Sequence, residues 1–241
     1  MDIGKTFGFV FEDKDWVSKL LIGSVILAIP IFGIFALMGY AIALIRSVKA
    51  NASRPLPDWQ NLGGYFVDGL MFWIATLLYT LPLWILMCPI GAVWVLPMFA
   101  AEQEELMAIL AGISGIVSMG LGCLVVLYGI LLMLLTPVLQ IRYAESGEIG
   151  GCLRFGEVFR FLLANIGPII ISQVLLFVIA TIVMTALSTV IGALNFIPIC
   201  GQILGLVLSF LMLPATVWLM LLSAHMYGQI ARQAEMSRGL A

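Results

Sequence analysis

The sequence predicts an all-α protein with several membrane-spanning helices. Hydrophobic residues make up 63% of the chain and charged residues only 10%, and the mean hydropathy is +1.16. A soluble globule needs far more polar surface than this. The lysines and arginines fall into four clusters, separated by long stretches that hold none: Lys5 to Lys19, Arg46 to Arg54, Arg142 to Arg160 and Arg232 to Arg238. The stretches between the clusters are the expected membrane segments.

A short pattern of apolar residues, glycine and phenylalanine occurs three times and predicts three repeated units within a single membrane domain, at residues 1–54, 55–150 and 151–241. Each copy has apolar residues four positions apart, which places them on one face of a helix. These faces are Ile3, Phe7 and Phe11; Leu62, Phe66 and Leu70; and Phe155, Phe159 and Leu163. We expect each unit to begin with an amphipathic helix in the membrane interface.

A second element recurs inside each apolar run, as Pro30 to Gly33, Pro89 to Gly91 and Pro198 to Gly201. Proline does not continue a helix, and glycine accepts the backbone angles of sharp turns. Each unit is therefore expected to contain an interfacial helix, a membrane helix, a Pro-Gly turn and a return helix. Because helical membrane proteins are rich in both residues, chance similarity is the alternative explanation of the repeats.

The first apolar run, Leu20 to Ile45, allows two topologies. A single tilted span would put the basic clusters on either side of it on opposite sides of the membrane. A re-entrant hairpin that reverses at Pro30 would leave both clusters in the cytoplasm, in agreement with the positive-inside rule. We favour the hairpin.

In the second unit we expect a span from Gly69 to about Met87, then an extracytoplasmic stretch that holds Trp84, Trp94 and Pro97, and a long return helix to Tyr143. In the third, Gly167 to Ala193 and Ile203 to Tyr227 form two spans. The chain would then have four spans and one hairpin, with both termini in the cytoplasm.

The segment between the first two units reads P-L-P-D-W, from Pro55 to Trp59. Pro55 and Pro57 predict a stiff, extended connector. Trp59 is expected to anchor it at the membrane interface, which tryptophan favours.

The sequence carries no catalytic motif that we recognise. No metal-ligand pattern, P-loop, dinucleotide fingerprint or nucleophile elbow is present, the four cysteines form no C-x-x-C pair, and the net charge is -2. We therefore expect no enzyme activity and no nucleic-acid partner. The only histidine, His225, is a candidate ligand for haem or a pigment, although a hydrogen-bonded histidine at the interface is the more ordinary explanation.

Five segments together are similar to a known family: F-V-F-E-D-K-D-W from Phe9, P-L-P-D-W from Pro55, F-V-D-G-L from Phe66, Y-A-E-S-G from Tyr143 and H-M-Y-G-Q from His225. Their order resembles the prokaryotic membrane family called domain of unknown function four-thousand-thirteen. The resemblance implies a small polytopic membrane protein of bacteria or archaea. It implies no activity, so no catalytic residues follow from it.

Three functions are compatible with the sequence. The leading hypothesis is a non-enzymatic scaffold or accessory subunit of a complex in the prokaryotic inner membrane, whose partners are membrane lipids and other membrane protein subunits. The alternative is a transporter or lipid-handling protein whose broken helices, at Pro30, Pro89 and Pro198, line an apolar cavity. The third is pigment or haem binding through His225. Because the apolar runs hold no charged residue, proton-driven transport is disfavoured.

Overall fold

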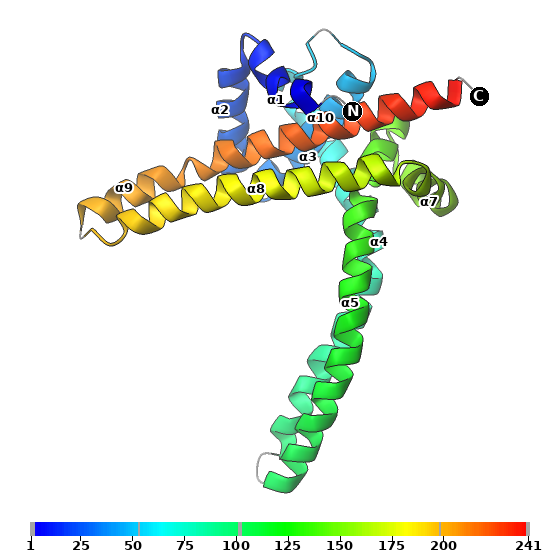
Figure 1. Cartoon of the computed structure of the whole chain (residues 1–241), viewed down its shortest axis with the longest axis vertical. Helices are drawn as coiled ribbons and strands as arrows, with labels where there is room; N and C mark the ends of the chain where they lie inside the picture. The colour runs from blue at the N-terminus through cyan, green and yellow to red at the C-terminus, as the bar shows by residue number, and fades with distance from the viewer. Residues whose placement is uncertain (1–2, 53, 101–102, 198, 240–241) are drawn as a thin grey trace. The chain divides into compact units, whose positions relative to one another are not determined.

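The computed structural model describes residues 3–52, 54–100, 103–197 and 199–239, and within these ranges the chain forms helices and no strand (Figure 1). Five segments are long and apolar enough to cross a membrane: Phe32–Lys49, Trp59–Phe99, Glu104–Ser146, Ile166–Leu194 and Cys200–Ser237. The predicted fold class, an all-α polytopic membrane protein, is confirmed. The chain divides into two compact units, which we call the main unit (residues 1–74 and 137–241) and the hairpin unit (residues 75–136).

The main unit contains most of the helices. They are α1 (Ile3–Glu12), α2 (Trp16–Leu27), α3 (Phe32–Lys49), the short 3-10 turn η1 (Trp59–Asn61), the beginning of α4 (Leu62–Val95), the end of α5 (Glu104–Ser146), α6 (Ile149–Leu153), α7 (Phe155–Ala164), α8 (Ile166–Leu194), α9 (Cys200–Ser209) and α10 (Met212–Gly239).

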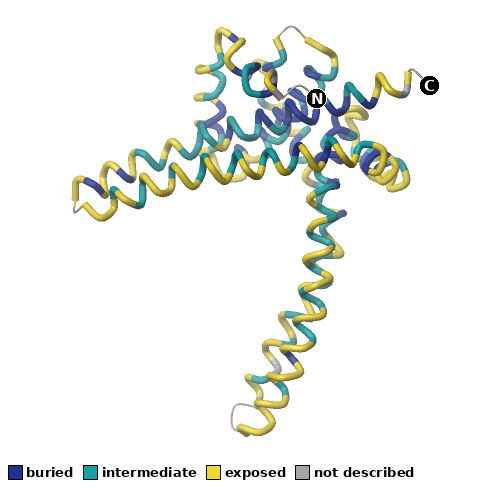
Figure 2. Tube along the Cα trace, viewed as in Figure 1, coloured by how far each residue is buried: buried dark blue, intermediate teal, exposed yellow. Residues whose placement is uncertain are grey.

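The core of the main unit forms around α10, which packs against α1, α2, α3 and α8. Its fully buried side chains include Tyr40 and Ile45 from α3, Tyr143 from α5 and Leu222 from α10. Figure 2 shows buried parts of the chain concentrated in the main unit around α3 and α10. The helices bury apolar side chains against one another in this core. Removing apolar surface from water is the main driving force for packing wherever the helices would otherwise contact water.

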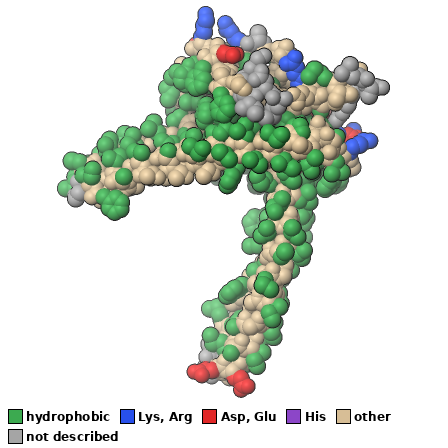
Figure 3. Space-filling model, in the orientation of Figure 1, with side chains coloured by type: hydrophobic (Ala, Val, Ile, Leu, Met, Phe, Trp, Pro, Cys, Tyr) green, Lys and Arg blue, Asp and Glu red, His purple; other side chains and the backbone are tan. Residues whose placement is uncertain are grey.

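Outside this core, α8, α9 and α10 extend as a long hairpin with little buried surface (Figures 1 and 2). In α8 only Ile169 and Ser172 are buried, and in α9 only Gly201 and Gly205. Figure 3 shows hydrophobic side chains along the visible face of this hairpin. Helices that are apolar all round require an apolar environment, as a lipid bilayer or another protein provides.

The hairpin unit pairs residues 75–95 of α4 with residues 104–136 of α5. Ser114 donates a hydrogen bond to the carbonyl of Val93 (2.8 Å), and the Tyr128 hydroxyl donates to that of Tyr79 (2.8 Å). These pairings make the two helices antiparallel. Among the described residues of this unit only four are buried: Ala75, Tyr79, Ser114 and Leu135.

The chain reverses at Pro30, between α2 and α3. Ile31 adopts a positive φ of 65° with ψ of -62°, and the Phe32 N–H donates to the Pro30 carbonyl over 2.7 Å, which together form a γ-turn. Gly33 lies so close to α2 that an added Cβ would be 2.0 Å from the Ile26 carbonyl oxygen. A single span over Leu20 to Ile45 is therefore wrong, and a helical hairpin forms instead. Its depth in the membrane stays a prediction.

The third copy of the turn repeats this geometry. Ile199 has φ of 60° and ψ of -70°, and a Cβ on Gly201 would lie 2.1 Å from the Leu194 carbonyl oxygen. Pro198 lies outside the described residues. The expected reversal between two apolar helices is confirmed here, because α8 ends at Leu194 and α9 begins at Cys200.

The turn expected at Pro89 to Gly91 is wrong, since α4 continues through Pro82 and Pro89 to Val95. The reversal comes later, after the 3-10 segment η2 (Leu96–Ala100). A proline inside a membrane helix removes one hydrogen bond, a loss that neighbouring groups can accommodate. A Cβ on Gly91 would also meet nothing within 4 Å, so this glycine does not make the close contact found at the other two turns.

Two further expectations for this region are corrected. Trp84 and Trp94 belong to α4 and not to a separate interfacial stretch, and the amphipathic start at Leu62 is the first turn of the same helix. The first and third copies thus share features that the second lacks. The division into three repeated units stays a prediction.

Candidate functional site

The P-L-P-D-W connector is fixed to α2 and α3 by a cluster of polar contacts. The Lys19 ammonium lies 2.9 Å from carboxylate oxygens of both Asp13 and Asp58, and it donates a hydrogen bond to the Leu56 carbonyl over 3.0 Å. Lys19 lies in the first turn of α2, and the connector follows α3. These contacts therefore bring together the two ends of the α2–α3 hairpin.

Aromatic side chains complete this cluster. Trp59 stacks on Tyr40 with ring centroids 4.0 Å apart, and its indole N–H donates to the Lys19 carbonyl over 2.9 Å. The Tyr40 hydroxyl donates to the carbonyl of Pro57 over 2.9 Å. Trp59 therefore packs within the main unit, a structural role that the sequence did not predict. Its role as a membrane anchor stays a prediction.

Burial and pairing act in opposite directions on the charges of this cluster. Burial disfavours the ionised form of Asp13, but the Asp15 N–H and the Lys19 ammonium outweigh it, so the pKa of Asp13 falls below its usual value. Burial also disfavours charged Lys19, yet hydrogen bonds to Asp58 and Asp13 raise the pKa of this ammonium above its usual value. Both groups are held in their charged forms at neutral pH.

The phenylalanine motifs of α1 and α7 lie alike in the structure. Among the residues of α1 whose side chains the structure describes, which exclude Ile3, the buried ones are Thr6, Phe9 and Val10. At the same motif positions of α7 the buried residues are Val158, Phe161 and Leu162. The predicted face is the more exposed one in both helices: Phe7 is half-buried and Phe11 exposed, and Phe155, Phe159 and Leu163 are all exposed. Each helix therefore has apolar residues both toward the core and away from it.

Phe66, the counterpart in α4, has a different environment. Its ring stacks on Phe32 with centroids 5.0 Å apart and makes an edge contact with Phe35 at 5.8 Å. Two glycines bring these helices together: a Cβ on Gly39 would lie 1.8 Å from the Tyr65 carbonyl oxygen, and one on Gly69 would lie 1.8 Å from that of Phe35. Phe66 thus helps to pack the start of α4 on α3.

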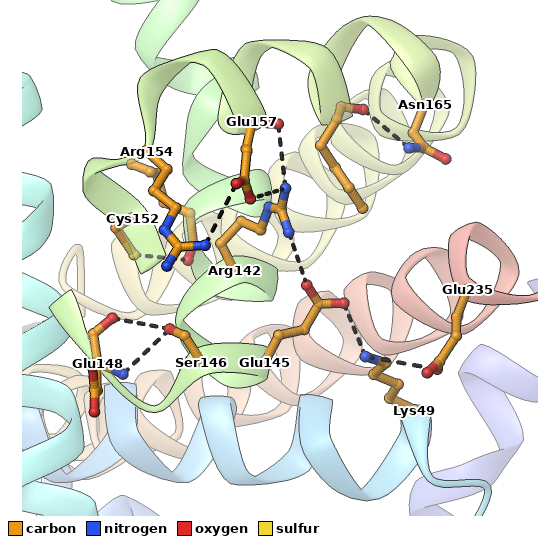
Figure 4. A network of polar contacts seen from close by, with 12 residues as sticks. Lys49, Arg142, Glu145, Ser146, Glu148, Cys152, Arg154, Glu157, Asn165 and Glu235 are labelled. Carbon is orange, nitrogen blue, oxygen red and sulfur yellow. Dashed lines mark hydrogen bonds and ion pairs between the residues drawn. The ribbon is translucent and has the colours of Figure 1, made fainter. Parts of the chain in front are cut away.

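A chain of alternating charges joins the helix ends of the main unit (Figure 4). Lys49 of α3 pairs with Glu145 of α5 (2.9 Å) and with Glu235 of α10 (3.6 Å). Arg142 of α5 then pairs with Glu145 (3.4 Å) and with Glu157 of α7 (3.2 Å).

The chain of charges ends at Arg154, which lies 3.5 Å from Glu157. A separate pair joins Arg46 of α3 to Asp68 of α4 over 2.7 Å, and the Arg46 Nε–H donates to the Ala144 carbonyl over 3.0 Å. Sequence analysis recognised the basic clusters but not the pairs that join different helices, because the partners in those pairs lie 15 to 186 positions apart in the chain.

His225 lines a cavity of about 310 Å³ together with residues that include Phe9, Asn51, Gln229 and Arg232. The imidazole stacks on Phe9 with centroids 4.0 Å apart, and its Nδ1 lies 3.3 Å from the Gln229 side-chain nitrogen. Arg232 donates a hydrogen bond to the Asn51 side chain at the rim.

The role of His225 in binding a haem or pigment stays a prediction. Pro55 lines the same cavity, whereas Pro30 and Pro89 line none of the three cavities described for this chain. Within the main unit the structure thus brings together His225 and the connector.

Comparison with curated proteins and with solved structures gave no significant match. Comparison with family models gave one, over residues 22–196, which cover more than half of the chain. The matched range begins within α2 and includes α3, the connector, the hairpin unit and α8. The chain therefore belongs to the family described as Protein of unknown function (DUF4013).

Proposed function

We propose that the chain is a non-enzymatic scaffold or accessory subunit of a larger complex in a prokaryotic cell membrane. In this proposal the main unit holds the helix ends together, and the apolar hairpins contact lipid and other membrane protein subunits. Both termini would lie in the cytoplasm, beside the basic clusters.

The observation that carries the proposal is the exposed apolar surface of the α8–α9 hairpin and of the hairpin unit. Residues 161–231, which include α8 and α9, contain no aspartate, glutamate, lysine or arginine, and neither do residues 69–101. Large apolar side chains on α8 and α9 are more than half exposed, among them Phe177, Ile182, Val190 and Leu206. Surfaces of this kind can pack against other membrane helices.

The charged groups give a second argument. Four of the eight described ion pairs connect one helix to another within the chain: α3 to α4, α3 to α5, α3 to α10 and α5 to α7. Charges used in this way fix the arrangement of helices, as a scaffold requires. They are not placed in the apolar segments, where ion-coupled transport would need them.

Site-specific photo-cross-linking in the native membrane tests the proposal. A photoreactive residue in place of Phe177, Ile182 or Leu206 should give adducts with another protein of constant mass. The same residue in place of Leu222, which is fully buried, is the matched control and should give none. If every exposed position gives only lipid adducts, the proposal of a partner subunit is wrong.

Lipid handling is the second candidate. It is supported by a cavity of about 570 Å³ that is lined by arginines and lies beside α7, a helix with an exposed apolar face. The transport hypothesis as formed from the sequence required broken helices around an apolar cavity, and α4 is not broken at Pro89.

A further inference from the structure

We propose that the cavity between α5, α7 and α10 binds the phosphate group of an anionic phospholipid. The cavity has a volume of about 570 Å³, and its lining includes Arg142, Arg160, Glu157, Phe161, Asn165 and Ser237. This site does not depend on the scaffold proposal, and it deepens the lipid-handling candidate, which rests on the same cavity.

The first argument is the charge of the lining. Glu157 accepts from both Arg142 (3.2 Å) and Arg154 (3.5 Å), so its negative charge is already compensated. Arg160 is exposed and has no ion pair among the described residues. The neighbouring chain of ion pairs contains three carboxylates and three basic groups, so its charges balance. The positive charge of Arg160 is therefore not compensated by this chain of ion pairs.

The second argument is an unused donor. The Nε–H of Arg142 is buried and has no hydrogen-bond partner among the described residues. A buried donor without an acceptor is costly, and roughly nine in ten such groups are satisfied in folded proteins. The guanidinium of Arg142 lies over the Phe161 ring, 5.6 Å from its centroid, and arginine N–H groups are well suited to bind phosphate oxygens.

The third argument is the beginning of α8. Asn165 lines the cavity and immediately precedes Ile166, the first residue of this long helix. In the first turn of α8 the backbone N–H groups of Ile166 and Gly167 have no acceptor within the helix, whereas Pro168 has no N–H. Asn165 and Ser237 donate to the Phe161 and Ala234 carbonyls, so the arginines and this helix end are the groups left to bind an anion.

The source of the phosphate follows from α7. Its face of Phe155, Phe159 and Leu163 is exposed, by 54%, 38% and 69%, and Arg160 follows Phe159 directly. An amphipathic helix with such a face lies at the membrane surface, with its apolar residues among the acyl chains. A lipid whose tails cover these side chains would bring its phosphate to Arg160, whereas a free phosphate would leave them uncovered.

Thermal unfolding of the full chain in a neutral detergent tests the proposal. Short-chain phosphatidylglycerol should raise the unfolding temperature in a saturable way, and short-chain phosphatidylcholine and inorganic phosphate should have little effect. Arg160→Gln should weaken the apparent affinity for phosphatidylglycerol about tenfold. Without added lipid its unfolding temperature should equal that of the wild type, because Arg160 has no described ion pair to lose.

Lys14→Gln is the matched control, since Lys14 is also exposed but lines none of the described cavities. It should leave the affinity unchanged. Equal losses in both variants would show unspecific attraction and overturn the proposal. An equal response to phosphatidylcholine would exclude recognition of the anionic headgroup, and saturation by inorganic phosphate alone would overturn the assignment to lipid.

Discussion

At the scale of single residues, Lys19 joins α2 to the connector and to Asp13. Its ammonium contacts two carboxylates and a backbone carbonyl, and its own carbonyl accepts the Trp59 indole N–H. The Asp13 side chain of this cluster is only 4% exposed. Removing one partner of a buried pair leaves the other charge away from water and without a partner. The stability lost by breaking such a pair therefore exceeds the net stability that the intact pair contributes.

Asp13→Asn is therefore expected to destabilise the protein by about 1 to 3 kcal/mol, the usual contribution of a hydrogen bond to a charged group. Asp15→Asn is the control, because the Asp15 side chain is exposed and has no ion pair among the described residues. Thermal unfolding in detergent would measure both. Equal effects of the two substitutions would contradict a specific role of the Asp13 carboxylate.

The pair also predicts a pH dependence. Because the pKa of Asp13 is lowered in the folded state, its stabilisation is complete above the usual value of 3.8 and is lost as the pH falls through the lower folded value. The pKa of Lys19 is raised, so its contribution is complete below the usual value of 10.5 and is lost at higher pH. Unfolding temperatures of the wild type should fall in acid below about pH 4. Asp13→Asn should lack this component, and an identical acid dependence in both proteins would contradict it.

At the scale of helices, the γ-turns at Ile31 and Ile199 are the most unusual feature. A positive φ is costly for a β-branched residue, by about 1 to 3 kcal/mol, yet both turns contain isoleucine. The close approach of Gly33 and Gly201 to the preceding helix explains why the chain accepts this strain, since it lets two apolar helices pack directly after the turn.

Replacing Ile31 by glycine should stabilise the protein by about 1 kcal/mol, because glycine adopts a positive φ without strain and Ile31 is 69% exposed. Ile34→Gly is the matched control: Ile34 is 53% exposed but lies in α3, where glycine should destabilise by about 1 kcal/mol. Unfolding temperatures would distinguish the two. A loss of stability in Ile31→Gly would show that the isoleucine side chain outweighs the strain.

The contact between α3 and α4 gives a second prediction for helices. Gly39→Ala and Gly69→Ala should each destabilise by about 1 to 3 kcal/mol, because the added methyl group would collide with a backbone carbonyl. Gly63→Ala, in the same helix as Gly69, has open space around its Cβ position and should not destabilise; alanine's helix propensity should instead add up to about 1 kcal/mol. If all three substitutions are tolerated equally in unfolding measurements, the two helices do not pack as described.

Sequence patterns predicted part of this arrangement. Apolar length and charge located the spanning helices, and the Ile-Pro-Ile-x-Gly segments located two reversals, because a proline and a closely packed glycine act together there. The same reasoning failed at Pro89, where the glycine makes no close contact and the helix continues. The ion pair of Lys49 with Glu145 joins residues almost 100 positions apart, and nothing local in the sequence indicates it.

At the scale of the whole molecule, the chain covers only part of its apolar surface with its own residues. The side chains of the core around α10 are buried, but the α8–α9 hairpin and the hairpin unit expose apolar side chains. Lipid alone can cover such helices, and so can other subunits. The proposal of a scaffold or accessory subunit depends on the second possibility.

Native mass spectrometry after gentle extraction from the native membrane tests this most directly. The account predicts assemblies in which this 26.2 kDa chain occurs with other membrane proteins at a fixed stoichiometry. Disruption of the assembly by bulky substitutions at Phe177 or Ile182, with the chain still inserted and folded, would identify the hairpin as the contact. A single chain that carries only lipid, in repeated preparations, would contradict the account.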